Sequence, residues 1–438
     1  MAKREAVLSV IVDAWGGMHP GAWRDPNAPA DPAMDLERIK GMVQTAERGK
    51  FHCFFLADSL AQAMEKDPAV LALTSNAARY EPFTLLSALA MVTDRIGLAL
   101  TASTTYSEPF NIARMFASLD HLSGGRAAWN VVTSTGEAAP NFNNHVLERE
   151  ERYERASEFY DVVSGLWDSL EDDAFRRDKD SGLFFEPGKL HSLNHVGKYF
   201  SVEGPLNISR PPQGHPVIAQ AGSSTSGLAF AVRVAELLFT YGLELDAAKE
   251  LYAKVKGMAA DEGRNPDDVK VLPSLGIVVG STQAEADAKL ARIDALADPR
   301  IGIERLKGLI DYDLTPHDLD GPVPDVPETE SWSKTMQDYY LGMAREQNLT
   351  VRELALVAMR FDAVAMSADR VADHIEEHVT GNAADGFNVS FADANGSLEI
   401  FVDEVVPKLQ ARGLFHKDYR GATLRENLGL SRPQNRFV

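Results

Sequence analysis

The stretch Val217-Ile218-Ala219-Gln220-Ala221-Gly222-Ser223-Ser224-Thr225-Ser226-Gly227 joins a short apolar strand to a helix-forming segment, residues 228–235. Glycine lets a ligand approach the backbone closely, and free N–H groups and hydroxyls at a helix start bind anions. The same small residues also serve as a plain turn and helix cap. The stretch therefore predicts a strand–turn–helix unit whose turn is either a phosphate cradle or a simple cap.

The rest of the chain repeats this strand-then-helix order. Apolar, strand-like runs cover residues 6–13, 51–58, 96–104, 127–134, 216–224, 237–241, 271–280 and 386–391. Amphipathic helical patterns lie between them, at 35–48, 82–92, 111–122, 150–170, 228–235, 246–262, 283–296 and 368–379, with a last one at 398–410. Several strands are apolar without alternation, which is typical of a parallel sheet buried on both faces.

Eight such repeats predict an α/β fold, a closed (β/α)₈ TIM barrel. The rival architecture is an open doubly wound sheet. No Gly-x-Gly-x-x-Gly motif follows the first strand, which disfavours the dinucleotide-binding version of that rival. We expect one domain over residues 1–438 with insertions after strands 1, 4 and 7, at about 14–33, 172–213 and 299–331. In a barrel, all three are expected at the catalytic face. Such long connections are often lids or binding loops, with disordered surface as the alternative, and we favour a lid for the first and third.

The composition excludes some classes of protein. Of 438 residues, 45% are hydrophobic and 25% charged, which is ordinary for a globular protein. The net charge of -20 argues against a nucleic-acid partner. The single cysteine, Cys53, excludes an internal disulfide and fits a reducing compartment. The sequence has no signal-peptide layout and no apolar run long enough to span a bilayer, so we expect a cytoplasmic protein that is not bound to a membrane.

Polar residues collect where the expected strands end. Asp58 closes the second strand, Thr104 the third, Asn130 lies in the fourth, and the serine pair Ser223 and Ser224 follows the fifth. Active sites of (β/α)₈ enzymes lie at these carboxyl ends. No acid pair, metal-ligand cluster or Ser–His–Asp order accompanies them, so we assign neither a catalytic residue nor a metal. The pattern indicates a site that holds a polar cofactor carrying the chemistry itself.

A resemblance extends this interpretation over nearly the whole chain. The motifs that carry it occur in one order: Phe54-Phe55-Leu56-Ala57-Asp58, Glu81-Pro82-Phe83, Ser107-Glu108-Pro109-Phe110-Asn111-Ile112-Ala113-Arg114, Leu119-Asp120-His121-Leu122-Ser123-Gly124-Gly125-Arg126, Trp129-Asn130-Val131-Val132-Thr133-Ser134, Asn141-Phe142, Arg152-Tyr153-Glu154-Arg155-Ala156-Ser157-Glu158-Phe159, Gln220-Ala221-Gly222-Ser223-Ser224 and Ala384-Asp385-Gly386-Phe387. The chain resembles the flavin-dependent monooxygenases of the nitrilotriacetate, dibenzothiophene-sulfone and pristinamycin-synthase type, within the bacterial luciferase-like superfamily.

The resemblance implies a cofactor, a co-substrate and partners. The cofactor is FMN in its reduced form, FMNH2, and O2 is the co-substrate, with oxygen transferred to a small organic molecule through a peroxide at C4a of the flavin. C–N or C–S cleavage is one possible outcome. A separate NAD(P)H:flavin reductase supplies the reduced flavin, and the chain is a homo-oligomer, a dimer or tetramer.

The resemblance also implies site residues. Asp58 and Thr104 contact the flavin ring or ribityl region, while Tyr153, Ser223 and Ser224 bind towards the ribityl chain and phosphate. Asn130 is a further candidate for flavin contact. For substrate, the candidates are Trp15, His19 and Trp23, in the loop after the first strand.

One position departs from the family pattern. Arg149 stands where members commonly have His, four residues before Tyr153 and so on the same helix face. Either it binds the phosphate with its guanidinium, or it points to solvent and one contact is lost. Two other functions remain open: a deazaflavin-dependent oxidoreductase on the same barrel, and a non-catalytic flavin-binding relative.

Overall fold

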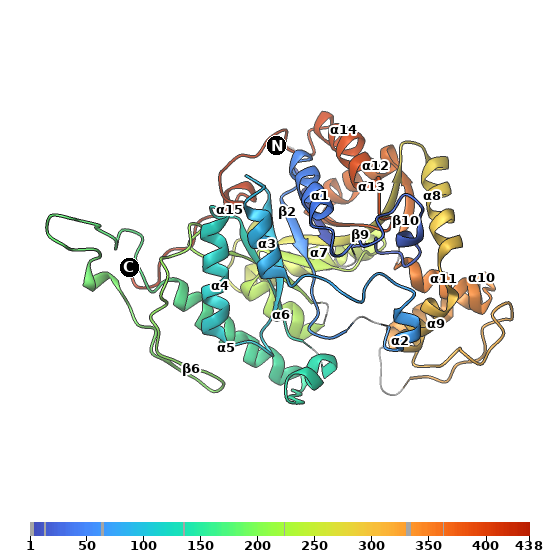
Figure 1. The fold of residues 1–438 in the computed structure, drawn as a ribbon, viewed down its shortest axis with the longest axis horizontal. Helices are drawn as coiled ribbons and strands as arrows, with labels where there is room; N and C mark the ends of the chain where they lie inside the picture. The colour runs from blue at the N-terminus through green and yellow to red at the C-terminus, as the bar shows by residue number, and fades with distance from the viewer. Residues whose placement is uncertain are drawn as a thin grey trace.

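A closed parallel barrel forms the centre of the molecule (Figure 1). The computed structural model describes residues 4–12, 15–62, 65–134, 136–222, 224–329, 334–361 and 363–438. The barrel strands are β1 (Val7–Val12), β2 (Cys53–Leu56), β3 (Gly97–Ser103), β4 (Ala127–Val132), β7 (Val217–Ala221), β8 (Leu237–Thr240), β9 (Lys270–Gly280) and β11 (Gly386–Phe391). Each pairs in parallel with its neighbours, and the pairing of β8 with β9 closes the ring. The predicted (β/α)₈ barrel is confirmed.

Helices surround the barrel as the alternating pattern predicts. They are α1 (Leu36–Arg48), α3 (Pro82–Ala90), α4 (Pro109–Leu122), α5 (Arg149–Trp167), α6 (Thr225–Val234), α7 (Leu245–Asp261), α8 (Gln283–Leu296) and α12 (Ala368–Thr380). The chain after β11 forms two short helices, α13 (Ser397–Ile400) and α14 (Val406–Ala411), joined by a π-helical turn, in place of the single helix expected over 398–410. Among the described residues, no helix has the length and apolar character needed to cross a membrane.

Two apolar layers hold these elements together. Trp129, Phe116 and Phe159 pack between the strands and the helices in the larger layer. The smaller layer fills the barrel interior near the strand starts, with side chains such as Val7 and Leu237. It also receives Leu424, from the short helix α15 (Leu424–Asn427), so the C-terminal tail closes the end of the barrel where the strands begin.

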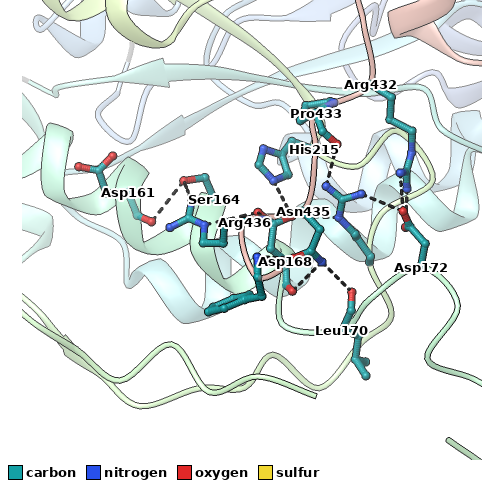
Figure 2. Close-up of polar contacts among 12 residues, drawn as sticks. Asp161, Ser164, Asp168, Leu170, Asp172, His215, Arg432, Pro433, Asn435 and Arg436 are labelled. Carbon is teal, nitrogen blue, oxygen red and sulfur yellow. Dashed lines mark hydrogen bonds and ion pairs between the residues drawn. The ribbon is translucent and has the colours of Figure 1, made fainter. Parts of the chain in front are cut away.

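The second insertion starts at that same closed end, which corrects the expectation that all three insertions lie at the catalytic face. The helix α5 carries the chain from the carboxyl end of β4 back to the strand starts before this insertion begins. There the buried Asp168 accepts hydrogen bonds from Arg210 Nε (2.9 Å) and His215 Nε2 (3.0 Å) and pairs with Arg436 of the tail (Figure 2). The hairpin of β5 (His195–Val196) and β6 (Ser201–Val202) then packs on α5, where His195 Nε2 lies 2.9 Å from a Glu158 oxygen.

The third insertion is longer than expected and is helical. It contains α9 (Pro299–Ile310), α10 (Lys334–Gln347) and α11 (Val351–Arg360), followed by β10 (Val364–Ser367), which pairs with the far half of β9. Leu306, Leu354 and their neighbours give these helices an apolar core of their own. In Figure 1 the three helices and the β5–β6 hairpin lie on opposite sides of the barrel.

Candidate functional site

A well opens at the carboxyl end of the barrel. Side chains alternate along each strand, so one layer of interior positions holds Ile11, Thr101, Ala221 and Ser274, contributed by alternate strands with the stagger of an eight-stranded barrel. Ala221 and Ser274 are exposed, and Ile11 and Thr101 are partly exposed, although all four face the barrel axis. Because three of these four residues are small, the upper barrel is open to solvent where other barrels are filled.

The next layer down closes the well. Phe55 and Phe239 stack across the barrel axis with ring centroids 4.8 Å apart. Asn130 and Asn388 occupy the other two positions of this layer and are 4% and 3% exposed. The floor of the well is therefore two aromatic rings flanked by two carboxamides.

The two asparagines are incompletely bonded. Asn130 Nδ2 donates to Thr101 Oγ1 at 2.9 Å. The Oδ1 atoms of both Asn130 and Asn388 are buried and have no hydrogen-bond partner among the described residues. A buried acceptor without a partner costs about 1–3 kcal/mol, so such atoms mark places where a ligand or water belongs. Asn388 was not among the predicted site residues. Its sequence signal is a polar side chain in an otherwise apolar strand, with Ser390 two residues later on the same face.

At the rim, the turn between β7 and α6 forms a tight cradle. Ser224 caps α6, its Oγ accepting from Gly227 N at 3.1 Å. A Cβ added at Gly227 would lie 2.9 Å from Tyr153 Oη and 3.1 Å from Ser224 Oγ. The structure thus brings Tyr153 and Ser224 together over the first turn of a ten-residue helix, whose N–H groups lack intrahelical acceptors. Ser223 lies outside the described residues.

Two other predicted residues stand at the rim on the neighbouring strands. Asp58 follows β2, and its Oδ1 lies 3.5 Å from Arg79 Nε. Thr104 follows β3 and is buried; its hydroxyl donates to the carbonyl of Val132 at 3.2 Å. Both residues lie at the carboxyl end of the barrel, with Asp58 beside a guanidinium group and Thr104 tied to the end of β4.

Arg149 is the first residue of α5 and is exposed to solvent. Tyr153 lies one turn further along the same helix, beside the cradle. Between them, Arg152 reaches back to the rim, where its Nη1 lies 3.4 Å from the Ser134 carbonyl oxygen. A phosphate at the cradle would thus meet the N-terminus of α6 and the first two turns of α5.

The loop after β1 holds the three candidate substrate residues, and each has partners within the protein. Trp15 is 6% exposed and packs in the larger apolar layer, between the strands and the helices. Trp23 Nε1 donates to the Leu73 carbonyl at 3.0 Å. His19 is fully buried, accepts from Gly21 N at Nδ1 (3.1 Å), and places Nε2 3.1 Å from Asp294 Oδ1. A role for these residues in substrate binding stays a prediction.

The surroundings of His19 shift the pKa of its ring. Burial lowers the pKa of His19, and Arg305 and Arg360 lower it further, against the opposing effect of Asp294. Nδ1 accepts the Gly21 N–H, and Nε2 lies 3.1 Å from Asp294 Oδ1. His19 therefore fastens the β1 loop to α8.

The arrangement fits a flat cofactor that carries a phosphate. The cradle, the helix N-terminus and the hydroxyls suit the phosphate, and the open well beside them suits a flat ring. In the described part of the chain, no three His, Cys, Asp or Glu side chains are grouped so that they could hold a metal ion.

Known proteins resemble this chain over nearly its whole length. The family model of luciferase-like monooxygenases matches residues 16–385. The chain is 47% identical to N-acetyl-S-(2-succino)cysteine monooxygenase of Bacillus subtilis (strain 168), an alignment that covers 100% of this chain and 99% of that protein. It is 46% identical to nitrilotriacetate monooxygenase component A of Aminobacter aminovorans, covering 96% and 95%.

A solved structure gives the same result in three dimensions. The structure of riboflavin lyase with modified FMN and riboflavin superposes with a TM-score of 0.84, at 30% identity over 98% of this chain and 97% of that one. Family model, full-length relatives and superposition coincide, and the chain belongs to the luciferase-like monooxygenase family.

Proposed function

We propose that this chain is the oxygenase component of a two-component monooxygenase that uses FMNH2 and O2. The observation that carries the proposal is the pairing of a phosphate cradle at the start of α6 with an open well beside it. The relative named nitrilotriacetate monooxygenase component A supports the division of labour. A separate NAD(P)H:flavin reductase is the partner that supplies FMNH2, and a homo-oligomer, dimer or tetramer, is the assembly.

The residues present would hold FMN along one line from rim to well. Ser224, with Ser223 beside it, and Tyr153 would bind the phosphate end, and Arg149 would add a positive charge there. Asp58, Thr104 and Asn130 would border the ribityl chain and the ring.

Bound FMNH2 supplies the activation of O2. The chain's own residues have three tasks: to bind the phosphate, to orient the ring and to keep water from the reacting atoms. The floor of Phe55 and Phe239 closes the well from below. Trp15 and Trp23, in the β1 loop beside the mouth, are proposed to border the substrate, and His19 holds that loop in place through Asp294.

The relatives favour a substrate with a carbon bonded to sulfur or nitrogen, because two at 46–47% identity are named for a thioether and a tertiary amine. One oxygen atom of O2 enters the C–H bond next to the heteroatom, and the other leaves as water with the two hydrogens of FMNH2. The hydroxylated carbon then releases the thiol or amine and becomes a carbonyl. The proposed outcome is oxidative C–S or C–N cleavage.

Product mass spectrometry under ¹⁸O2 tests this function. The protein is mixed with a flavin reductase, NADH and FMN, and offered N-acetyl-S-(2-succino)cysteine, nitrilotriacetate, other amines, sulfones, sulfonates and alkanes. We expect a cleaved or hydroxylated product that carries one ¹⁸O atom. The product is measured early, before its carbonyl oxygen exchanges with the oxygen of water. If every compound is recovered intact while all the oxygen becomes hydrogen peroxide, the proposed monooxygenase function is wrong.

A further inference from the structure

A finger of chain, residues 172–190, projects from the closed end of the barrel, where the second insertion begins. In Figure 1 it is the green loop that reaches furthest to the left. Its two limbs run antiparallel: Arg177 N donates to the Phe184 carbonyl at 2.9 Å, and Asp178 N donates to the Leu183 carbonyl at 3.0 Å. The finger is therefore shaped by its own backbone hydrogen bonds.

The finger exposes large apolar side chains. Leu183 and Phe184 are 41% and 62% exposed, and neither belongs to an apolar cluster among the described residues. The ring of Phe184 contacts Phe175 on the other limb, with centroids 5.7 Å apart. At the base, the exposed ring of Phe437 from the C-terminal tail stacks on His191 at 4.7 Å. A two-stranded ribbon is only marginally stable in water, so this apolar face indicates a partner surface.

The charge of the finger favours a second copy of this chain as that partner. The finger carries five acidic and four basic side chains, so it contributes a single unit to the net charge of -20. Two of its basic groups are paired within the finger, Arg176 with Glu186 and Lys189 with Asp173. Two strongly acidic chains repel each other, and the repulsion is least where both surfaces are apolar and nearly neutral.

The position of the finger disfavours the flavin reductase as its partner. The cradle proposed for FMN lies at the carboxyl end of the barrel, whereas the finger leaves from the end where the strands begin. A reductase that delivers FMNH2 has to reach the open mouth of the well. A second copy bound at the finger leaves the mouths of both copies free.

We propose that the finger is the contact through which two copies of this chain pair, with Leu183 and Phe184 packing against the same finger of the second copy about a twofold axis. Identical chains pair most often in this way, in which one surface patch meets itself. The inference rests on the proposed homo-oligomeric oxygenase and adds the surface that joins its subunits.

Sedimentation equilibrium of the full chain tests the pairing. Wild type should sediment as a dimer or tetramer at micromolar concentration. Phe184→Ser should raise the dissociation constant between copies at least about tenfold, because a central aromatic side chain carries much of the binding energy of an interface. Leu183→Ser should act in the same direction. Both substitutions replace exposed side chains, so each subunit should stay folded, which far-UV circular dichroism checks.

The control is Met91→Ser, which removes an exposed apolar side chain at the C-terminal end of α3. Its assembly should match that of wild type. If wild type pairs and neither finger variant weakens the pairing, the copies meet elsewhere and the inference is wrong. A monomeric wild type also overturns it, and loss of flavin-reductase binding by Phe184→Ser would then identify the reductase as the occupant.

Titration with FMN separates this inference from the proposed function. All four proteins should bind FMN equally, because the finger and Met91 lie away from the cradle. Normal FMN binding together with unchanged assembly in the finger variants would contradict the inference alone. Absence of FMN binding by wild type would contradict the proposed function.

Discussion

At the scale of single residues, Arg149 is the position where we expect the chain to depart from its family's pattern. Its guanidinium is exposed at the start of α5, one turn before Tyr153 and the cradle. An exposed charge pair contributes about 0.2–1 kcal/mol, so Arg149→His should weaken FMN binding by a factor between about 1.4 and 5 and leave riboflavin binding unaltered. Titration with both flavins at low and high salt measures the effect. Unchanged FMN affinity would mean that Arg149 only faces solvent.

Asp393, just after β11, makes a second residue-scale prediction. The residue keeps some solvent contact, but its Oδ1 is buried and unpartnered among the described residues. Burial, reinforced by Glu399, raises the pKa of Asp393 to about 7, against Ser397 and Lys289. The folded protein then binds a proton that the unfolded chain releases near pH 4, so stability falls as pH rises towards and through 7.

The Asp393→Asn substitution removes that titration. Its free energy of unfolding should therefore fall less than that of wild type between pH 5.5 and pH 8, as measured by urea denaturation at both values. An identical pH dependence in the two proteins would show that Asp393 titrates near its ordinary value.

At the scale of elements, the helices α9–α11 are joined to the loop after β2 by a buried ion pair. Arg305 Nε lies 2.8 Å from Glu65 Oε1, with the two side chains 4% and 0% exposed. Val70 packs against Ile301 and Met359 beside the pair. The same loop begins with Asp58, so its attachment positions one side of the site.

Breaking this pair should loosen the insertion. Leaving a buried charge unpaired costs about 3–5 kcal/mol, so Arg305→Met should speed proteolytic cleavage within residues 57–81 and 299–361. The double variant Glu65→Gln with Arg305→Met should recover part of the loss, since no lone charge remains. Arg352→Met, which breaks an exposed pair with Asp320 on the same insertion, is the control and should cleave like wild type.

At the scale of the whole molecule, the C-terminal tail ties the closed end of the barrel to α5. Burial opposes ionisation of Asp168, but His215 and Arg210 outweigh it and hold the pKa of Asp168 below its ordinary value. The stabilisation is present above the unfolded pKa, near 3.9, and is lost as pH falls through the folded value.

Asp168→Asn should therefore lower the free energy of unfolding at pH 7 by about 3–5 kcal/mol. The substitution removes the buried carboxylate that Arg210, His215 and Arg436 all contact. Asp161→Asn, on the exposed face of the same helix (Figure 2), should cost less than about 1 kcal/mol. Equal losses in the two variants, measured by urea denaturation, would contradict a central role for Asp168.

The sequence predicted the features of the fold that depend on residues close together in the chain. The apolar strands, the helix cap at Ser224 and the polar strand ends at Asp58 and Thr104 are properties of short stretches, and the structure has them where they were expected. The sequence did not predict that Asn388 shares the floor layer with Asn130, because this placement depends on barrel closure and strand stagger. The second insertion lies at the opposite face from the one predicted, because α5 carries the chain back to the strand starts before the insertion begins. The His19–Asp294 contact joins residues 275 positions apart, which no local periodicity encodes.

The central claim, that the cradle at the start of α6 holds the phosphate of FMN, is tested most directly by comparing FMN with riboflavin. Anaerobic calorimetric titration of wild type and Gly227→Ala with both reduced flavins gives the contribution of the phosphate. We predict that wild type binds FMN at least tenfold more tightly than riboflavin, and that Gly227→Ala loses this preference, since its Cβ would lie 2.9 Å from Tyr153 Oη. Equal binding of the two flavins by wild type would contradict the account.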